Sequence, residues 1–218
     1  MSLQTIINNA DTVKINRRRM VGIQISRNEI AYTSETPTRN PWQLTVKVSR
    51  LFRYEQARAM LESIDYLDRD VPETITFSDN AGLSFMFAYQ GELNGTQLGN
   101  ILVDSFVGNE LIITNLGSIS YGDLIYARGD FIQIDGHAYP FTVVNDLYRN
   151  ANPSQTLTTH RPNFITAAVA GQGIVVGNDV DFRVICPNMP TYTIRPGGST
   201  ALVEFDTEFQ LYEYTGGA

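Results

Sequence analysis

The sequence has little cysteine, histidine or lysine, and no long apolar run. Cys186 is the only cysteine, which excludes an internal disulfide and any zinc site that needs two thiols. We therefore expect synthesis in a reducing compartment. No run approaches the roughly 18 apolar residues needed to cross a bilayer, and the first residues lack the cationic and then apolar pattern of a signal peptide. We expect neither membrane insertion nor secretion by that route.

The two histidines offer little for catalysis or metal binding. His137 follows a predicted hairpin turn and His160 lies in a predicted loop, and neither has a second metal-type residue at ligand spacing. The sequence contains no Gly-x-Ser-x-Gly elbow and no Gly-Lys-Ser/Thr phosphate loop. We predict a protein that is not an enzyme, with no catalytic residues, metal ligands or cofactor. A Ser-His-Asp arrangement that forms only in space stays open as a hydrolase alternative.

Charge of the two signs is divided unevenly along the chain. The net charge is −7, but residues 1–60 hold ten basic and four acidic groups and so carry +6, which leaves −13 for the other 158 residues. The acidic total argues against non-specific nucleic-acid binding, which depends on Lys and Arg. A cationic head and an anionic body favour head-to-tail packing of subunits in a ring. Uneven surface composition without a role is the alternative.

Three consecutive arginines, Arg17, Arg18 and Arg19, form the densest cationic cluster. Guanidinium groups bind carboxylates or phosphates through paired hydrogen bonds. Because the rest of the chain is acidic, we predict that this cluster contacts carboxylates on a neighbouring subunit. An exposed strand start without a partner is the alternative.

Alternating apolar residues predict strands in the first part of the chain. Residues 20–26 and 42–48 each place apolar side chains on one face, and the turn-rich segment 36–41 between them predicts that they pair as a hairpin. Further strands are predicted at residues 74–77 and 83–89.

Residues 54–67 have helical periodicity, with charged residues off the apolar face. The apolar face of this predicted helix consists of Ala57, Met60, Leu61, Ile64 and Leu67.

Alternation is most regular near the C-terminus, and it predicts a strand with one buried face. Its apolar odd positions are Val203, Phe205, Phe209 and Leu211, and its polar even positions are Glu204, Asp206, Glu208 and Gln210. This pattern matches the N-terminal strands, so we expect the strand to join their sheet.

Residues 101–184 differ, because they contain short strand-like segments separated by Gly and Asn, with a hairpin turn at Asp135-Gly136. The segments are 110–114, 131–134, 139–144, 164–169 and 180–184. We predict a mainly β protein: a β-sandwich-like sheet domain with one packed helix, interrupted by a small Greek-key barrel of the oligonucleotide/oligosaccharide-binding (OB) type. The expected boundaries are residues 1–104 plus 185–218 for the first domain and 105–184 for the barrel, after a linker or exposed loop at 91–100.

Two stretches make this chain resemble the distal tail proteins of long-tailed bacteriophages. Residues 42–48 followed by 57–64 are similar to the strand and helix of that family. Residues 128–144, RGDFIQIDGHAYPFTVV, resemble its barrel hairpin, GD-x-I-x-I-x-G-x-x-Y-x-V-x-x-V, although Phe141 departs from the spacing.

The resemblance implies a structural subunit of the virion, made in the bacterial host cytoplasm. About six copies would form a ring at the tail tip or baseplate, joining the tail tube protein to the hub protein while DNA passes through the bore without specific binding. The barrel would point outward and hold peripheral tail-tip or fibre proteins. The candidates for contacts between subunits are Arg17, Arg18, Arg19, Glu204, Asp206 and Glu208.

A carbohydrate-binding β module is the main alternative, because barrels of this type recognise sugars as well as single strands. A nucleic-acid groove is less favoured, since no lysine follows Lys47. The basic residues of the predicted barrel are only Arg128, Arg149, Arg161 and Arg183.

Overall fold

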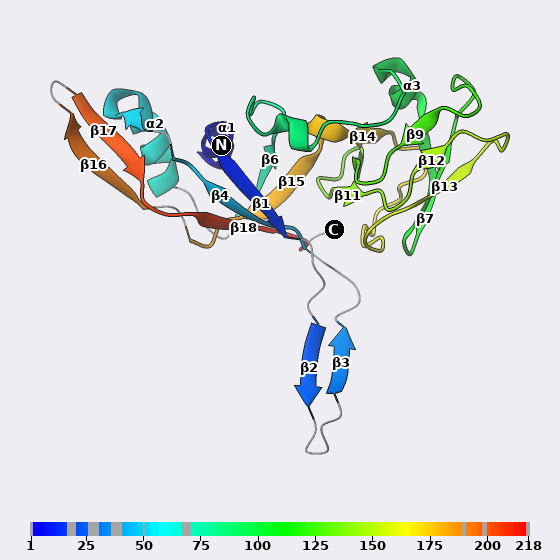
Figure 1. Cartoon of the computed structure of the whole chain (residues 1–218), viewed down its shortest axis with the longest axis horizontal. Coiled ribbons are helices and arrows are strands. Elements are labelled where there is room, and N and C mark those ends of the chain that lie inside the picture. The colour runs from blue at the N-terminus through cyan, green and yellow to red at the C-terminus, as the bar shows by residue number, and fades with distance from the viewer. Residues whose placement is uncertain are drawn as a thin grey trace.

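A computed structural model of the chain describes residues 2–16, 21–25, 31–35, 41–49, 51–66, 71–188, 191–197 and 200–216. Within these ranges the fold is mainly β and its paired strands run antiparallel, as the sequence predicts. Figure 1 shows an elongated body with helices α1 and α2 toward one end and the short strands of the middle of the chain at the other.

The central sheet joins strands from both ends of the chain. Its order is β1-β4-β18-β15-β6, so the last strand lies between two strands that are far from it in sequence. This confirms the prediction that the C-terminal strand returns to the N-terminal sheet. The strands are β1 (Thr12–Asn16), β4 (Gln43–Lys47), β6 (Glu73–Thr76), β15 (Asp181–Ile185) and β18 (Phe209–Glu213).

The pairing of β4 with β18 follows from their matching alternation. Leu44 lies opposite Leu211, and Val46 lies opposite Phe209, and all four side chains are buried. Directly opposed side chains share one face of a sheet, so these pairs form a continuous apolar strip. The polar residues between them face the other side.

A second sheet has the order β16-β17-β5 and packs against helix α2. Helix α2 confirms the prediction of a helix at 54–67, although it ends at residue 65. It buries Ala57, Met60 and Leu61. The predicted C-terminal strand is two strands, because it breaks between Phe205 and Phe209. The bounds are β5 (Phe52–Arg53), α2 (Tyr54–Asp65), β16 (Tyr192–Gly197) and β17 (Thr200–Phe205).

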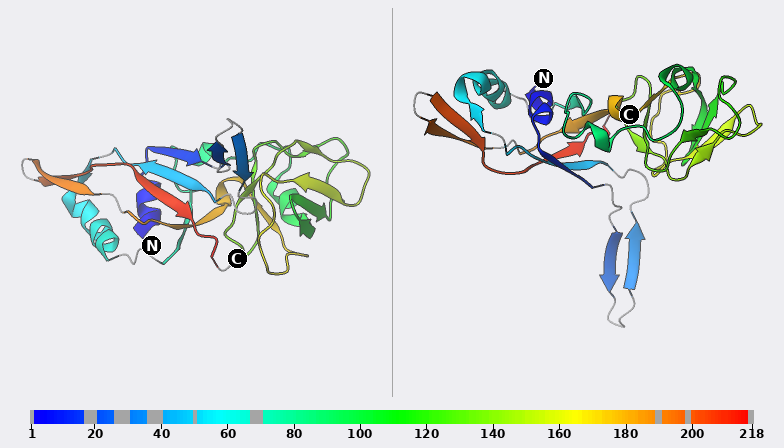
Figure 2. Two further views of the ribbon diagram at one scale, coloured as in Figure 1. Left: turned by 90° about the horizontal axis from the view of Figure 1, so that it is seen from below. Right: turned by 45° about the horizontal axis from the view of Figure 1, so that its top comes forward.

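A short helix at the N-terminus, α1 (Ser2–Asn8), was not expected from the sequence. Leu3, Ile6 and Ile7 are fully buried, at the i, i+3, i+4 spacing of one helical face. Helix α1 contacts both α2 and β6, and the views in Figure 2 show both helices on the same side of the strands.

The predicted hairpin between residues 20–26 and 42–48 is wrong in its pairing. Strand β2 (Val21–Ile25) pairs with β3 (Ala31–Glu35), and β4 pairs with β1. The two predicted strands therefore have other partners, and residues 36–40 of the predicted turn lie outside the described residues. Figure 1 shows β2 and β3 extending away from the body.

The middle of the chain forms small sheets around its own apolar centre. The predicted strands at 110–114 and 131–134 are present there, whereas the one predicted at 180–184 is β15 of the central sheet. The small sheets have the orders β11-β10-β14, β12-β9 and β13-β8-β7. The strands are β7 (Leu102–Val107), β8 (Glu110–Thr114), β9 (Leu124–Tyr126), β10 (Phe131–Ile134), β11 (Phe141–Thr142), β12 (Leu147–Tyr148), β13 (Gln155–Thr158) and β14 (Ile174–Val176).

The predicted turn at Asp135-Gly136 is confirmed. Strand β10 pairs with β11 around it, and Gly136 has a φ of 78°, a left-handed conformation that favours glycine. The expected loop at 91–100 contains a capped helix, α3 (Gly95–Asn100), in which the Asn94 side chain accepts from the Gln97 backbone N–H.

Two predicted strands are absent from the described residues. Residues 164–169 form no strand, and residues 83–89 form turns and a 3-10 helix, η1 (Ser84–Met86). A second 3-10 helix is η2 (Gly177–Asp179). The buried Asn80 explains the first 3-10 helix, because its Oδ1 accepts from the N–H groups of Gly82 and Leu83 at 3.0 and 3.1 Å and so bends the chain.

Two clusters of buried apolar residues lie side by side along the molecule. The first includes the central sheet, helices α1 and α2, and β17, and the second includes most short strands of the middle of the chain. Val103 belongs to the second cluster, whereas Val180 and Phe182 belong to the first. Such clusters do not define domains, so the boundaries at 104/105 and 184/185 stay a prediction.

Candidate functional site

The predicted acidic contact residues each have a partner within the same chain. Glu204 on β17 forms an ion pair with Arg195 on β16, with an N–O distance of 2.7 Å. Asp206 Oδ1 accepts from the Thr193 hydroxyl at 2.7 Å. These partners hold the carboxylates against β16, at one end of the molecule.

Glu208 lies across the sheet from β1 and accepts two hydrogen bonds from Lys14 Nζ, each 2.9 Å long. This hydrogen bond is the largest cause of the lowered pKa of Glu208. Both side chains are exposed, so the pair is open to a further partner. Arg17, Arg18 and Arg19 lie outside the described residues, and the predicted subunit contacts of both groups stay a prediction.

His160 lies where the two apolar clusters meet, and it packs there as part of the core. Its Nδ1 accepts from the Thr142 backbone N–H at 2.9 Å, and its ring centroid lies 4.9 Å from that of Trp42. These contacts fix the ring in the core. Its neighbour Arg161 is the more informative residue.

Arg161 and Glu213 form a fully buried ion pair that the sequence analysis did not identify. The guanidinium donates to both carboxylate oxygens, at 2.5 and 2.7 Å, and both side chains have 0% exposure. The backbone N–H of Trp42 donates to the same carboxylate at 3.0 Å. Glu213 occupies an odd, buried-face position of the C-terminal strand, and an acid on an apolar face is a signal that a cation lies nearby.

The Pro140 carbonyl completes this junction. It accepts from Arg161 Nη2 and from Trp42 Nε1, both at 2.8 Å. The guanidinium also lies 4.6 Å from the ring centroid of Phe164 and 5.0 Å from that of Phe141. The arrangement ties residues of the second cluster to β4 and β18 through charge, hydrogen bonds and stacking.

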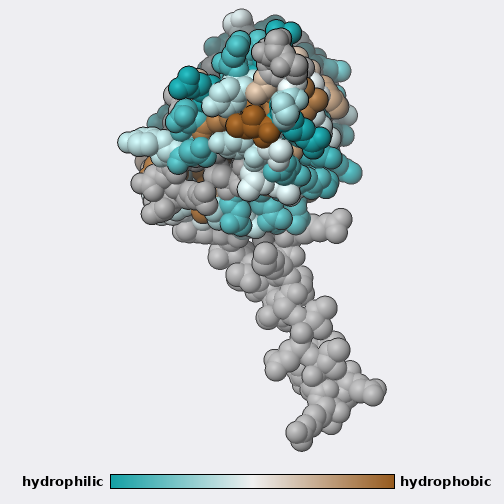
Figure 3. All heavy atoms as spheres, turned by 90° about the vertical axis from the view of Figure 1, so that its left-hand side faces the viewer, coloured by the Kyte–Doolittle hydropathy of each residue, from teal (hydrophilic) through white to brown (hydrophobic). Residues whose placement is uncertain are grey.

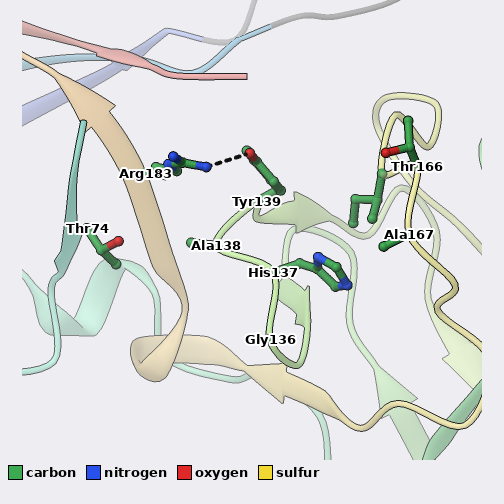
Figure 4. Close-up of a pocket in the computed structure, with 9 residues that line it drawn as sticks. Thr74, Gly136, His137, Ala138, Tyr139, Thr166, Ala167 and Arg183 are labelled. Atoms are coloured by element: carbon green, nitrogen blue, oxygen red, sulfur yellow. Dashed lines mark hydrogen bonds between the residues drawn. The ribbon is translucent and has the colours of Figure 1, made fainter. Parts of the chain in front are cut away.

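Beside this junction is an open cavity of about 380 Å³ between the central sheet and the loops at 136–139 and 165–167. Thr74 and Arg183 line it from the sheet, and two loops line it from the other side (Figure 4). His137, considered above for catalysis, lies on its wall. The lining residues are Thr74, Gly136, His137, Ala138, Tyr139, Ile165, Thr166, Ala167 and Arg183.

The opposite end of the molecule carries exposed apolar side chains. Ile194 on β16 is 48% exposed, and Tyr66 after α2 is 91% exposed. The Tyr192 hydroxyl donates to Asp65 at 3.1 Å, which holds the start of β16 beside the end of α2. We call Tyr66, Ile194 and the outer edge of β16 the end surface. Figure 3 shows a hydrophobic patch on this side of the molecule, bordered by hydrophilic side chains.

Neither a cluster of metal-type ligands nor a helix able to span a membrane is found in the part of the chain that the structure describes. No three His, Cys, Asp or Glu side chains gather there as metal ligands would. None of the helices described there is long and apolar enough to cross a bilayer.

Comparisons of the sequence with known proteins do not assign this chain to a family. No model of a known protein family matches it. No curated protein matches it significantly. Its function is therefore inferred from its fold and its surfaces.

Proposed function

We propose that this chain is a structural subunit that assembles with copies of itself into a ring at the tail tip or baseplate of a long-tailed bacteriophage. In this role the ring connects the tail tube to the hub and anchors peripheral tail proteins. Two features support the proposal: strands from both chain ends share one sheet, and helix α2 packs on the strands beside it. The sequence resemblance described above implies the same organisation.

The exposure of the end surface is the main support for self-assembly. Strand β16 is an edge strand, and its residues 193–197 are all exposed. Edge strands present unpaired backbone groups on which another chain can add a strand. Exposed apolar side chains such as Tyr66 and Ile194 mark contact surfaces in the same way.

Charge supplies a second support. The exposed Lys14–Glu208 and Arg195–Glu204 pairs place both signs on the surface of the first cluster. Opposite charges at the edges of an apolar contact set its register and speed its formation. Assembly through such contacts weakens as salt rises, because salt screens exposed charges.

Light scattering of the purified chain at low and high salt tests the proposal. We expect a mass of about six chains at low salt, falling as salt rises. Ile194→Glu should lower this mass, because it places a charge in the end surface. Val107→Glu is the matched control, since Val107 is 74% exposed on β7 of the second cluster. A monomer under every condition, or equal effects of the two variants, would contradict the proposal.

A further inference from the structure

One side of the cavity beside the central sheet is formed by two paired strands, β6 and β15. Thr74 on β6 lies directly opposite Arg183 on β15, so both side chains project from the same face of the sheet. The neighbours of Arg183 in the strand, Phe182 and Val184, project to the other face and are buried. The strand alternation therefore places the Arg183 side chain on the face of the sheet that lines the cavity, and Figure 4 shows its guanidinium reaching the Tyr139 hydroxyl.

Arg183 is held in place from both sides. Its Nη1 donates to the Tyr139 hydroxyl at 3.3 Å, and its guanidinium lies 5.2 Å from the ring centroid of Tyr214. Its backbone N–H donates to the Ala138 carbonyl at 3.3 Å, which joins β15 to the loop that forms the wall. A cation fixed in this way loses little freedom when a ligand binds.

The charge of Arg183 has no carboxylate partner among the described residues. Three other cations there form ion pairs: Lys14 with Glu208, Arg161 with Glu213, and Arg195 with Glu204. A guanidinium has five N–H donors in a planar fork that matches a carboxylate. Arg183 therefore offers a cavity-facing site for one negative charge.

The rest of the lining suits hydroxyl groups. His137, Thr74 and Thr166 contribute ring nitrogens and hydroxyls to the lining, and Ala167 contributes a small side chain. A volume of about 380 Å³ is at the small end of ligand sites. The Arg183 guanidinium and several hydrogen-bonding side chains match a small molecule with one carboxylate and several hydroxyls.

We propose that this cavity binds a hydroxylated carboxylate with the chemistry of a hexuronate sugar. The carboxylate pairs with the guanidinium of Arg183, and the hydroxyls face His137, Thr74 and Thr166. This site is separate from the end surface, so it stands whether or not the chain forms a ring.

Ligand-observed NMR titration of the full chain with glucuronate, glucose and inorganic phosphate tests the site. Glucuronate should bind saturably, and glucose, which has the ring without the charge, should bind at least about tenfold more weakly. Glucose binding equal to that of glucuronate would overturn the proposal. Phosphate binding as tight as that of glucuronate would overturn the role of the hydroxyls.

Variants on opposite walls of the cavity test whether glucuronate binds there. Arg183→Gln should weaken glucuronate binding roughly ten- to hundredfold, as expected for a lost hydrogen bond to a charged group. Ala167→Phe fills the cavity from an exposed position and should abolish binding even if Arg183→Gln folds poorly. Arg128→Gln, at an exposed arginine, is the matched control and should bind as the original chain does. Equal affinity for glucuronate in all three variants would show that it binds outside this cavity and would overturn the proposal.

Discussion

The guanidinium of Arg161 and the carboxylate of Glu213 meet in a two-pronged ion pair where the two apolar clusters adjoin. The residues are 52 positions apart, and neither side chain is exposed. A buried pair with this two-pronged geometry gives one arrangement of the two parts a strong advantage over others, because any displacement leaves a charge unpaired.

Removing one partner of this ion pair should lower the stability of the fold. Glu213→Gln leaves the buried guanidinium without a counter-charge, and we expect the free energy of unfolding in urea to fall by about 3–5 kcal/mol. The double variant Arg161→Met with Glu213→Leu should recover most of this loss, since it removes both charges. Glu208→Gln, in the exposed pair with Lys14, is the control and should change stability little. Equal losses for Glu213→Gln and Glu208→Gln would contradict the prediction.

Asn80 should stabilise the turn after β6 far more than an exposed cap does. Its Nδ2 donates to the carbonyls of Ile7 and Ala10 at 2.6 and 3.0 Å, and the side chain is 3% exposed. Asn80→Ala deprives both carbonyls of this donor, and we expect a loss of about 2–3 kcal/mol in chemical denaturation. Asn94→Ala, at the exposed cap of α3, should cost about 1 kcal/mol. The reverse order of the two losses would refute this account.

The Lys14–Glu208 pair should be visible in the titration of the carboxyl group. The hydrogen bond from Lys14 lowers the pKa of Glu208 below its ordinary value. Lys14→Met should raise this pKa toward the ordinary value, measured by NMR of the side-chain carboxyl carbon. Because the folded pKa is lowered, the contribution of the pair is present at neutral pH and is lost as pH falls through that pKa. An unchanged titration in Lys14→Met would contradict the prediction.

Stability should decline at alkaline pH through Tyr89. Burial is the main cause that raises the pKa of Tyr89 to about 12, and its hydroxyl donates to the Ile125 carbonyl at 2.5 Å. Since the folded pKa exceeds the unfolded value of about 10, the contribution is complete below pH 10 and is lost as pH rises toward 12. Burial also raises the pKa of Tyr126, which adds to the decline.

The measurement is the free energy of unfolding between pH 8 and 12, taken from urea titrations. Tyr89→Phe should be less stable than the original chain at pH 8, because the Ile125 carbonyl loses its donor. Its further decline above pH 10 should be smaller, because one ionising group is gone. Parallel declines in the two proteins would show that Tyr89 is not the group responsible.

Local periodicity predicted the long elements well. Helix α2 and strands β4 and β18 were predicted because their apolar spacing extends over several residues. The segment 83–89 was misread as a strand, because its apolar residues resemble one while the turn depends on the Asn80 side chain. Helix α1 was missed, since seven residues are too few for helical spacing to stand out.

The candidate site was harder to predict than the fold. Histidines and the arginine triplet drew attention in the sequence, whereas the cavity depends on Arg183, Thr74 and Tyr139. Arg183 and Thr74 belong to no motif, and the motif that contains Tyr139 indicated a hairpin and not a binding site. Glu213 did carry a signal, because it is an acid at a buried-face position. Its partner could not be identified, since four arginines of the predicted barrel were equally available.

The sequence by itself determined the mainly β class, the helix at α2 and the return of the last strand to the first sheet. These follow from spacing along the chain, because backbone geometry repeats every two residues in a strand and every 3.6 in a helix. Only the tertiary structure decided that Arg161 meets Glu213, that Asn80 bends the chain, and that Arg183 faces a cavity. Such contacts depend on distances in space between segments whose separation in sequence carries no information about their approach.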